Sequence, residues 1–444
     1  MFNKILIANR GEIALRIIRA CKELGIATVA VHSQVDNESL HVAFADEAIC
    51  IGPYSASESY LNIKNIISAA EVAGADAIHP GYGFLAENAN FARICNECNI
   101  RFIGPKVEHI DTMGNKSKAK EVMEKLGVPV VPGSKSAVRN LEEGLAVAND
   151  TGYPVMIKAS AGGGGKGMRV VYDKDGFTKA FNMSKYEAKK SFGDDSVYIE
   201  KYIENPRHIE VQIFGDNYGN VVHFFERECS IQRRHQKVLE EAPSPFVDDK
   251  LRESMGEASV KAMKSLGYQN CGTIEYLVDK NKNFYFMEMN TRIQVEHPVT
   301  EMITSVDLLK LQIMAAAGER LPYNQEDLKI NGHAIEVRIN AEDPKTFRPS
   351  PGKITGYYAP GGFGVRVDST CYQDYIVLPY YDSLIAKLIT FDNTRRDAIS
   401  KMKRSLDEFI IEGIDTTIPL HKRIIVDKNF CDGNFSTSYL DQLV

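Results

Sequence analysis

The first hundred residues alternate short apolar runs with longer segments whose apolar side chains recur at helical spacing, and this alternation restricts the fold more than any other feature. KILIAN has the pattern of a short buried strand, and EIALRIIRACKELG has a helical pattern that ends at Gly25. ATVAVHS, AICIG and DAIHP predict further strands, and IKNIISAAEVAG predicts a helix that ends at Gly74. Strands separated by helices of this length form βαβ units, so we expect a doubly wound parallel sheet with helices on both faces.

Composition limits the class of protein. The chain has 444 residues with 44% hydrophobic and 25% charged side chains, which is typical of several globular domains. A net charge of −6 argues against nucleic-acid or membrane partners. The eight cysteines are scattered, which favours a reducing compartment, and no apolar stretch approaches the ~20 residues of a membrane span, so we expect a cytoplasmic protein. Cys95 and Cys98 form a single C-x-x-C pair that we interpret as helical thiols, with a redox or metal role as the alternative.

A glycine-rich segment, IKASAGGGGKGMRVV, lies between two runs that alternate like strands. Gly162, Gly164 and Gly167 match the spacing of a dinucleotide-binding loop, but that loop requires a helix directly after it, and MRVVY predicts a strand. The Walker A pattern also fails, because glycine follows the lysine of the loop. We expect a β-turn-β flap whose backbone amides hold phosphate, with Lys116 and Lys158 as nearby cations; a mobile hairpin without a ligand is the alternative.

The segment TIEYLVDKNKNFYFMEMNTR predicts two strands around a polar turn. If the turn centres between Asn281 and Lys282, Glu275 falls directly opposite Glu288, and Asn290 shares the face of Glu288. Two opposed carboxylates repel each other unless a positive charge lies between them. We therefore expect Mg²⁺ or Mn²⁺ to bind here and to bridge the phosphates of ATP, and two solvent-facing glutamates on a surface hairpin are the alternative.

Cationic and acidic side chains crowd three other segments of the strand-rich region. RIQVEHPVTE holds Arg292, Gln294 and Glu296, SIQRRHQK holds Lys237, and ENPRHIE holds His208. Arg292 offers a planar fork of donors that suits a carboxylate-like anion such as bicarbonate. Glu296 beside it is a candidate base for removing a proton from that anion.

A family resemblance is carried by seven segments: ILIANRGEIALR, HPGYGFLAENA, IKASAGGGGKGMR, ENPRHIE, RRHQKVLEEAPSP, MEMNTRIQVEHPVTEM and EVRINAEDP. Together they resemble the biotin carboxylase family, in order and from residue 1 to near 440. The resemblance implies a multidomain fold of the α/β and α+β classes that is called ATP-grasp. It places a doubly wound parallel-sheet domain at 1–114, an ATP-grasp domain at 115–330 with a lid subdomain at about 131–203, and a mixed C-terminal domain at 331–444.

The resemblance also implies a role for individual residues. For ATP these are Lys116, Lys158, Gly164, Gly165, Glu200, Lys201, Ile203, His208, Gln232, His235, Glu275, Leu277 and Glu288. The metal ligands are Glu275, Glu288 and Asn290, and two Mg²⁺ or Mn²⁺ ions are expected. Bicarbonate is expected at Lys237, Arg292, Gln294 and Val295, and biotin at Tyr82, Gly83 and Arg338. The catalytic set is Glu296, Arg292, Arg338 and Lys237.

The implied reaction is the ATP-dependent carboxylation of biotin by bicarbonate. Carboxyphosphate forms and breaks down to CO₂ and phosphate, the phosphate takes the N1′ proton of biotin, and Arg338 stabilises the enolate. The chain has no Met-Lys-Met tripeptide of the kind that carries biotin, so we expect biotin on a separate carboxyl carrier protein. Carboxyltransferase subunits are further expected partners, and the resemblance implies a homodimer. Exposed faces around Arg16, Arg19, Glu23 and Arg366 are candidates for the dimer contact, with ordinary surface charge as the alternative.

The final carboxyl acceptor and two rival functions stay open at this point. We expect acetyl-CoA as the acceptor, and another acyl-CoA or pyruvate is the alternative. Another ATP-grasp ligase, such as a carboxylate–amine or carbamoyl-phosphate-type enzyme, is not expected to carry RIQVEHPVTEM and RINAEDP together. A non-catalytic nucleotide sensor is a further alternative, which the intact charged set disfavours.

Overall fold

The computed structural model describes residues 1–159, 168–192 and 195–443. These residues divide into two compact units, each of which is described by itself. The first unit contains Met1–Val128, Arg207–Tyr276 and Glu288–Val444, and the second contains Pro129–Pro206 and Leu277–Met287. Gly164 and Gly165, predicted to bind ATP, lie outside the described residues.

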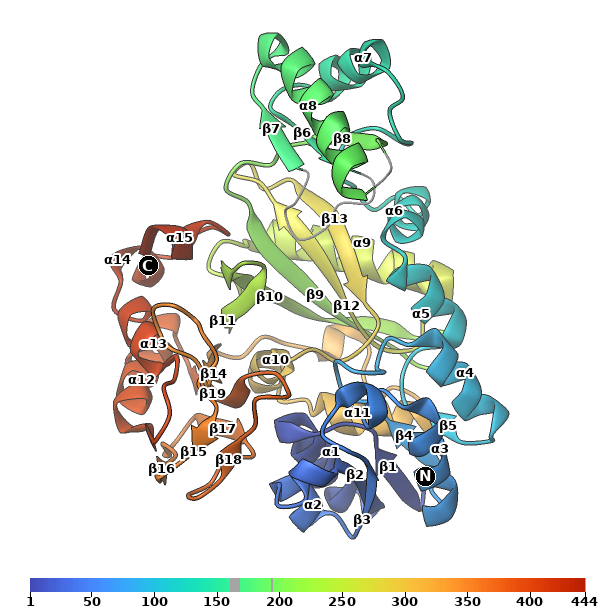
Figure 1. The fold of residues 1–444 in the computed structure, drawn as a ribbon, viewed down its shortest axis with the longest axis vertical. Coiled ribbons are helices and arrows are strands. Elements are labelled where there is room, and N and C mark those ends of the chain that lie inside the picture. Colours follow the sequence, from blue (N-terminus) through green and yellow to red (C-terminus); the bar gives the residue numbers. More distant parts are fainter. Residues whose placement is uncertain (160–167, 193–194, 444) are drawn as a thin grey trace. The chain divides into compact units, whose positions relative to one another are not determined.

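The first unit begins with a five-stranded parallel sheet in the order β3-β2-β1-β4-β5 (Figure 1). Its strands are β1 (Lys4–Ile7), β2 (Ala27–Ser33), β3 (Glu47–Gly52), β4 (Ala77–His79) and β5 (Arg101–Phe102). Its helices are α1 (Gly11–Glu23), α2 (Leu40–Phe44), α3 (Ile63–Ala73), α4 (Ala89–Glu97) and α5 (Val107–Gly114), and α6 (Lys116–Lys125) follows. The predicted doubly wound parallel sheet is confirmed.

The loops after β1 and β4 meet because these two strands are neighbours. Parallel strands present their carboxyl ends at one edge of the sheet. Asn9, after β1, donates hydrogen bonds from Nδ2 to the carbonyl oxygens of Pro80 and Tyr82, both at 2.7 Å. This contact fixes the GYGF loop next to the start of α1.

A second sheet, here called the central sheet, has eight antiparallel strands in the order β13-β12-β9-β10-β11-β14-β19-β17, and most of its residues belong to the first unit. Its strands are β9 (Arg207–Gly215), β10 (Val221–Arg233), β11 (Gln236–Ala242), β12 (Asn270–Val278), β13 (Phe284–Asn290), β14 (His333–Asn340), β17 (Val365–Ser369) and β19 (Leu384–Asp392). Helices α9 (Asp249–Leu266), α10 (His297–Thr304) and α11 (Leu308–Ala316) are interspersed with these strands. The pairing of β11 with β14 brings the C-terminal strands beside Lys237 and Glu240.

Two apolar cores join distant parts of the first unit. One packs Ile5 and Ile17 of the N-terminal region with Phe214 and Phe224 of the central sheet. The other packs the C-terminal helices with Ile231 and other side chains of the central sheet. Those helices are α12 (Arg395–Glu408), α13 (Ile418–Ile424), α14 (Lys428–Cys431) and α15 (Tyr439–Leu443). Four short strands pair as β15 (Gly352–Lys353) with β18 (Ile376–Val377) and β16 (Gly356–Tyr358) with β20 (Ile410–Glu412).

The second unit is built on a three-stranded antiparallel sheet in the order β7-β6-β8. It contains β6 (Val155–Ala159), β7 (Met168–Val171), β8 (Val197–Lys201), α7 (Leu141–Thr151) and α8 (Lys174–Phe192). Phe177 and Phe181 of α8 pack on Ile157 and Ile199 of the sheet. MRVV is therefore a strand, as its alternation predicts. Within the described residues, no helix of either unit is long and apolar enough to cross a membrane.

Candidate active site

Lys237 on β11 is the centre of a buried group of charges. Its ammonium Nζ lies 2.6 Å from Glu210, 2.9 Å from Glu275 and 2.6 Å from Glu296. Burial alone lowers the pKa of a lysine, but the three carboxylates raise the pKa of Lys237 well above its ordinary value. Lys237 therefore remains a cation that holds three strands and a loop around one point.

Glu296 joins this cation to a second one. Its Oε2 accepts a hydrogen bond of 2.9 Å from Arg338 on β14, while its Oε1 contacts Lys237. Burial raises the pKa of this carboxyl, but Lys237 and Arg338 lower it further, so the pKa of Glu296 lies below its ordinary value. Arg338 is in turn held by Glu240 of β11, whose Oε1 lies 2.5 Å from Nη2. Glu296 is thus fully ionised and shared between two cations.

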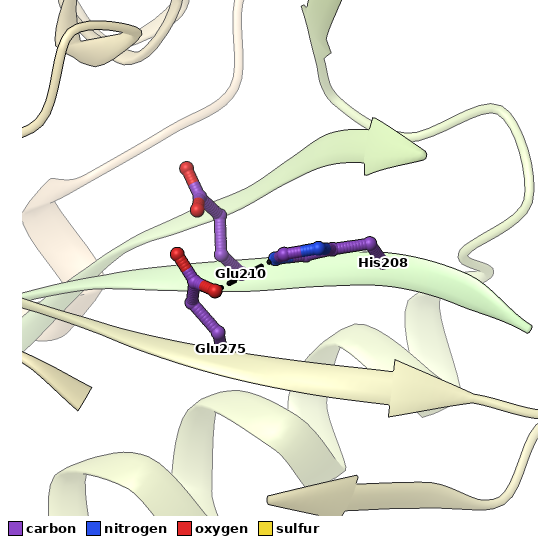
Figure 2. A group of neighbouring side chains, drawn as sticks. All are labelled: His208, Glu210 and Glu275. Atoms are coloured by element: carbon purple, nitrogen blue, oxygen red, sulfur yellow. Dashed lines mark ion pairs between the residues drawn. The ribbon is translucent and has the colours of Figure 1, made fainter. Parts of the chain in front are cut away.

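Glu275 of β12 lies beside His208 and Glu210 of β9 (Figure 2). The His208 Nε2 atom is 3.0 Å from Glu275 Oε2, and Gln232 holds the other ring nitrogen at 2.6 Å. Burial raises the pKa of Glu275, but Lys237 and His208 lower it well below its ordinary value. His208, Gln232 and Glu275, all predicted to bind ATP, therefore lie together. His235 is exposed in the tight turn before β11.

Gln294, predicted to bind bicarbonate, is oriented by a hydrogen bond from the buried side chain of Arg227. Its amide Nε2 donates to Glu275 Oε1 at 2.9 Å, and its Oε1 accepts from Arg227 at 2.9 Å. The Arg227 guanidinium is fully buried and also donates to Glu210 at 2.5 Å. Since both ends of the Gln294 amide have a partner, its orientation is fixed.

Arg292 reaches toward a loop of the parallel-sheet region. Its Nε donates to Glu87 at 2.7 Å, and its Nη2 donates to Asn290 at 3.0 Å. Asn290 donates to Glu275 at 2.9 Å, so this predicted metal ligand contacts a second one. Arg292 and Gln294 are therefore linked through Asn290 and Glu275.

The predicted hairpin exists, but its turn is displaced. A hydrogen bond of 2.9 Å from Asp279 N to Asn283 O closes the turn, which therefore centres on Asn281. The opposition of Glu275 and Glu288 was predicted from a centre between Asn281 and Lys282, so the predicted turn centre was wrong by half a residue. The two carboxylates also differ in environment: Glu275 is buried, whereas the Glu288 side chain is 31% exposed and pairs with Lys116 at 2.7 Å.

Tyr82 and Gly83, predicted near biotin, lie in the loop after β4. The Tyr82 hydroxyl donates to Glu12 at the start of α1. Gly83 is exposed and has a φ of +69°, a conformation that glycine adopts without strain. Val295, predicted to contact bicarbonate, accepts a 2.8 Å hydrogen bond at its carbonyl oxygen from Lys387 of β19.

In the second unit, Lys158 and Glu200 form an ion pair of 2.5 Å between β6 and β8. Lys201 directs its side chain to the carbonyl oxygens of Gly152 and Tyr153, each at 2.9 Å, so its ammonium is occupied within this unit. Ile203 and Leu277 are partly buried there. The roles of these residues in ATP binding stay predictions.

Sequence reasoning missed several members of the charged group: Glu12, Glu87, Glu210, Arg227, Glu240 and Lys387. Two carried a readable signal. Glu210 lies two residues after His208 and so shares its strand face, and Lys387 interrupts the apolar run LIAKLITF. The others acquire partners only through contacts between distant segments.

Two arginines predicted on an exposed dimer face are engaged inside the first unit instead. Arg16 is buried and lies 2.9 Å from Glu301 and 2.8 Å from Asp307. Arg366 pairs with Glu301 at 2.7 Å. Arg19 is exposed, as expected. Cys95 is buried in α4 and free, and burial raises the pKa of its thiol to about 12, which suits a structural thiol.

Comparison with known proteins first defines the class. The family model "Carbamoyl-phosphate synthase L chain, ATP binding domain" matches residues 115–324, and with the fold described above it makes the chain an ATP-grasp ligase. The models "Biotin carboxylase, N-terminal domain" and "Biotin carboxylase C-terminal domain" match residues 1–110 and 336–442.

Individual relatives cover almost the whole chain. Biotin carboxylase of Nostoc sp. is 61% identical, over 100% of this chain and 99% of its own length. One subunit of the pyruvate carboxylase of Methanothermobacter thermautotrophicus is 55% identical, over 100% of this chain and 90% of its own. The dimeric biotin carboxylase domain of Hydrogenobacter thermophilus 2-oxoglutarate carboxylase, solved with MgADP, ADP and bicarbonate, is 53% identical with a TM-score of 0.90, over 100% of this chain and 98% of its own. The chain belongs to the biotin carboxylase family, and its activity is that of a biotin carboxylase.

Proposed function

We propose that the chain carboxylates biotin on a carrier protein, using bicarbonate and ATP, through the residues gathered around Lys237. The observation that carries the proposal is the position of Glu296, a buried carboxylate between Lys237 and Arg338. Two cations around one ionised carboxylate provide both a base and a binding place for small anions. The solved relative with MgADP and bicarbonate, 53% identical over the full chain, supports the choice of substrates.

Glu275 and Asn290, which are in contact, would offer oxygen ligands to a divalent metal ion, and Glu288 joins them as a ligand through the family resemblance. All three offer oxygen ligands, which Mg²⁺ and Mn²⁺ prefer. Each carboxylate pairs with a lysine in the structure, Glu275 with Lys237 and Glu288 with Lys116. Both positions therefore stabilise a nearby positive charge, such as that of a metal ion. Mg²⁺, when bound, supplies charge neutralisation at the phosphates of ATP.

Glu296 accepts the bicarbonate proton in this proposal. As long as Lys237 and Arg338 both contact it, Glu296 is ionised but weakly basic, because they hold its pKa below the ordinary value. Anionic substrates compete for the same two cations, and weakening either ion pair raises the basicity of Glu296. The base is therefore strengthened when the anions arrive.

Arg338 has the second chemical role. After carboxyphosphate has released CO₂, phosphate takes the N1′ proton of biotin, and the guanidinium stabilises the negative charge that develops on the ureido oxygen. Glu240 also holds Arg338, by accepting a hydrogen bond of 2.7 Å from Nε. The guanidinium is therefore already oriented before substrates bind, which is the condition for effective electrostatic stabilisation.

The test is ATP hydrolysis by the purified chain with and without bicarbonate and free biotin. We expect hydrolysis that depends on bicarbonate and rises with biotin, together with transfer of ¹⁴C from bicarbonate to biotin. Hydrolysis stimulated by an amine instead of biotin would support a carboxylate–amine ligase. Binding of ATP without turnover under any of these conditions would support a nucleotide sensor.

We further propose that the carboxyl group finally reaches acetyl-CoA, through a biotin carboxyl carrier protein and carboxyltransferase subunits, and that the chain is a homodimer. The Nostoc relative, 61% identical over 99% of its own length and named only biotin carboxylase, supports a biotin carboxylase on a separate chain, and the dimeric solved relative supports the homodimer. The identities of 55% to the pyruvate carboxylase relative and 53% to the 2-oxoglutarate carboxylase domain are the reason to test other acceptors. Co-purification of the carrier, followed by assays with acetyl-CoA, pyruvate and 2-oxoglutarate, decides among them, and sedimentation measures the oligomeric state.

A further inference from the structure

Lys387 is a fully buried charge in a strand that is otherwise largely apolar. It lies on β19 within LIAKLITF, and its side chain is 0% exposed. A buried ammonium is costly unless it is paired and hydrogen-bonded. Its Nζ donates to the Val295 carbonyl oxygen at 2.8 Å and lies 3.1 Å from Glu12 Oε1. Lys387 therefore touches both the segment predicted to hold bicarbonate and the first turn of α1.

Glu12 extends this contact to the biotin side. The same Oε1 atom that faces Lys387 accepts the hydrogen bond from the Tyr82 hydroxyl. A single carboxylate oxygen therefore links the loop after β4 to β19, and β19 links it to Val295. The chain of contacts runs from Tyr82 through Glu12 and Lys387 to Val295. It joins four residues that are far apart in the sequence.

The surroundings of Lys387 keep it charged and directed at these partners. Burial lowers the pKa of Lys387, but Glu12, Glu336 and Asp368 raise it above its ordinary value. Arg338 and Asp368 are its cross-strand neighbours on β14 and β17. Since Arg338 lies directly opposite, this row of the sheet also carries the proposed biotin-stabilising guanidinium.

We propose that Lys387 and Glu12 are positioning residues that hold the bicarbonate segment at Val295 and the biotin loop at Tyr82 in one fixed geometry. The inference rests on the proposed function, since it assigns these two segments to the two substrates. Neither residue touches substrate in this scheme. Lys387 fixes the peptide at Val295, which is predicted to contact bicarbonate, and Glu12 fixes the Tyr82 hydroxyl near biotin. A displacement of either residue therefore changes the binding geometry of both substrates.

The variants K387M and E12Q, each alone and combined, test the inference. We expect K387M to raise KM for bicarbonate and for free biotin by about tenfold each, while KM for ATP changes less than about twofold. E12Q should raise both values less, because glutamine still offers one acceptor oxygen. The double variant should be no worse than K387M alone, since both changes interrupt one chain of contacts.

Lys401 supplies a matched control. Its Nζ also donates to a backbone carbonyl, that of Phe391 at 2.7 Å, and pairs with a carboxylate, Asp392 at 2.8 Å, but it touches no predicted site residue. K401M should therefore leave all three KM values unchanged. If K387M does not fold, E12Q carries the test, because it keeps Lys387 in place.

The outcomes separate this inference from the proposed function. A wild-type chain without bicarbonate-dependent turnover overturns the proposed function. If the wild type is active but K387M or E12Q has the same KM values as K401M, the inference is overturned. It is also overturned if the effects of K387M and E12Q add up in the double variant. A rise in KM for ATP equal to that for bicarbonate also overturns it, because general distortion of the unit then explains the loss.

Discussion

Glu296 is held by two cations, so its replacement has consequences for charge as well as for chemistry. Without the carboxylate of Glu296, the positive charges of Lys237 and Arg338 are neutralised by fewer negative charges. Glu210, Glu240 and Glu275 remain as their partners. Substitution by glutamine keeps the shape of the side chain and removes only the base and its charge. The glutamine variant is therefore a cleaner probe than alanine.

We expect Glu296→Gln to reduce biotin carboxylation by about 10²- to 10⁴-fold, the usual contribution of a general base. Affinity for MgATP, measured by titration calorimetry, should change less than about threefold, because Glu296 is not among the predicted ATP contacts. Glu241→Gln is the matched control: Glu241 is also a fully buried carboxylate with two partners, the Arg395 guanidinium and the His333 ring, and neither partner is a predicted site residue. Equal losses of carboxylation in the two variants would contradict the assigned role.

His421 predicts how stability responds to acid. It is buried in α13, with Nε2 2.7 Å from the Arg338 carbonyl oxygen, and burial lowers the pKa of the ring to about 4. The folded-state pKa is below that of the unfolded chain, about 6.5, so the unfolded chain binds the extra proton between these values. Stability contributed by the neutral ring is therefore lost as pH falls from about 6.5 toward 4.

Between pH 7 and pH 5 this loss amounts to about 2 kcal/mol for one histidine. Glutamine cannot take up the proton. Between pH 7 and pH 5 the unfolding free energy of His421→Gln should therefore fall by about 2 kcal/mol less than that of the wild type. Urea titrations at the two pH values measure it. His235→Gln, a change at an exposed histidine, should lose as much as the wild type, and the same behaviour in His421→Gln would refute the expectation.

Single residues divide into those that the sequence predicts and those that only the fold assembles. Glu296, Arg338 and Lys237 stand in segments that resemble a family, and the structure brings them within hydrogen-bonding distance. Glu240 and Lys387 become partners of the site because β11, β14 and β19 pair in register. That register depends on contacts between residues about a hundred positions apart for β11 with β14 and about fifty apart for β14 with β19, and local periodicity holds no information on such contacts.

At the scale of elements, local patterns predicted strands and helices well but not the joining of sheets. EIALRIIRACKELG and IKNIISAAEVAG became α1 and α3, each near its predicted glycine end. The displaced turn at Asn281 shows the limit of local reasoning: a shift of half a residue changes which side chains lie opposite each other. The continuity of the central sheet from β13 to β17 was not foreseen either, since sheet order is a non-local property.

A change in helix α9 is expected to affect the stability of the protein but not its activity. Its N-cap is Asp248, whose side chain accepts from Leu251 N at 2.9 Å, and its C-cap is Gly267 in the left-handed region at a φ of +60°. We expect Asp248→Ala to lower the unfolding free energy by about 1 kcal/mol, the usual value of an N-cap. KM and kcat should not change, because the helix contains no predicted site residue.

Asp248→Asn is the matched control, because asparagine caps helices about as well as aspartate. Urea unfolding of the three proteins measures the effect, and steady-state kinetics measures activity on the same samples. A loss of activity in Asp248→Ala at a temperature where it is fully folded would connect α9 to the site, contrary to expectation.

At the scale of the molecule, buried ion pairs join segments that the sequence divides into separate domains. Glu301 of α10 accepts from Arg16 of α1 at 2.9 Å and from Arg366 of β17 at 2.7 Å. Glu12 and Lys387 make a second link between the same two ends of the chain. The first unit, although made of three separate stretches of sequence, is therefore expected to unfold as one cooperative body.

Glu301→Gln tests that cooperativity. The change leaves the buried Arg16 and the half-buried Arg366 with fewer partners, and breaking a buried pair costs about 3 kcal/mol. If the first unit unfolds as a whole, native-state hydrogen exchange should show the same loss of protection in β1, near the N-terminus, and in β19, near the C-terminus. Glu408→Gln, which removes only the exposed pair with Arg404, should cost less than about 0.5 kcal/mol. Loss of protection confined to one of the two strands would show that the N-terminal and C-terminal regions open separately and that the buried pairs do not couple them.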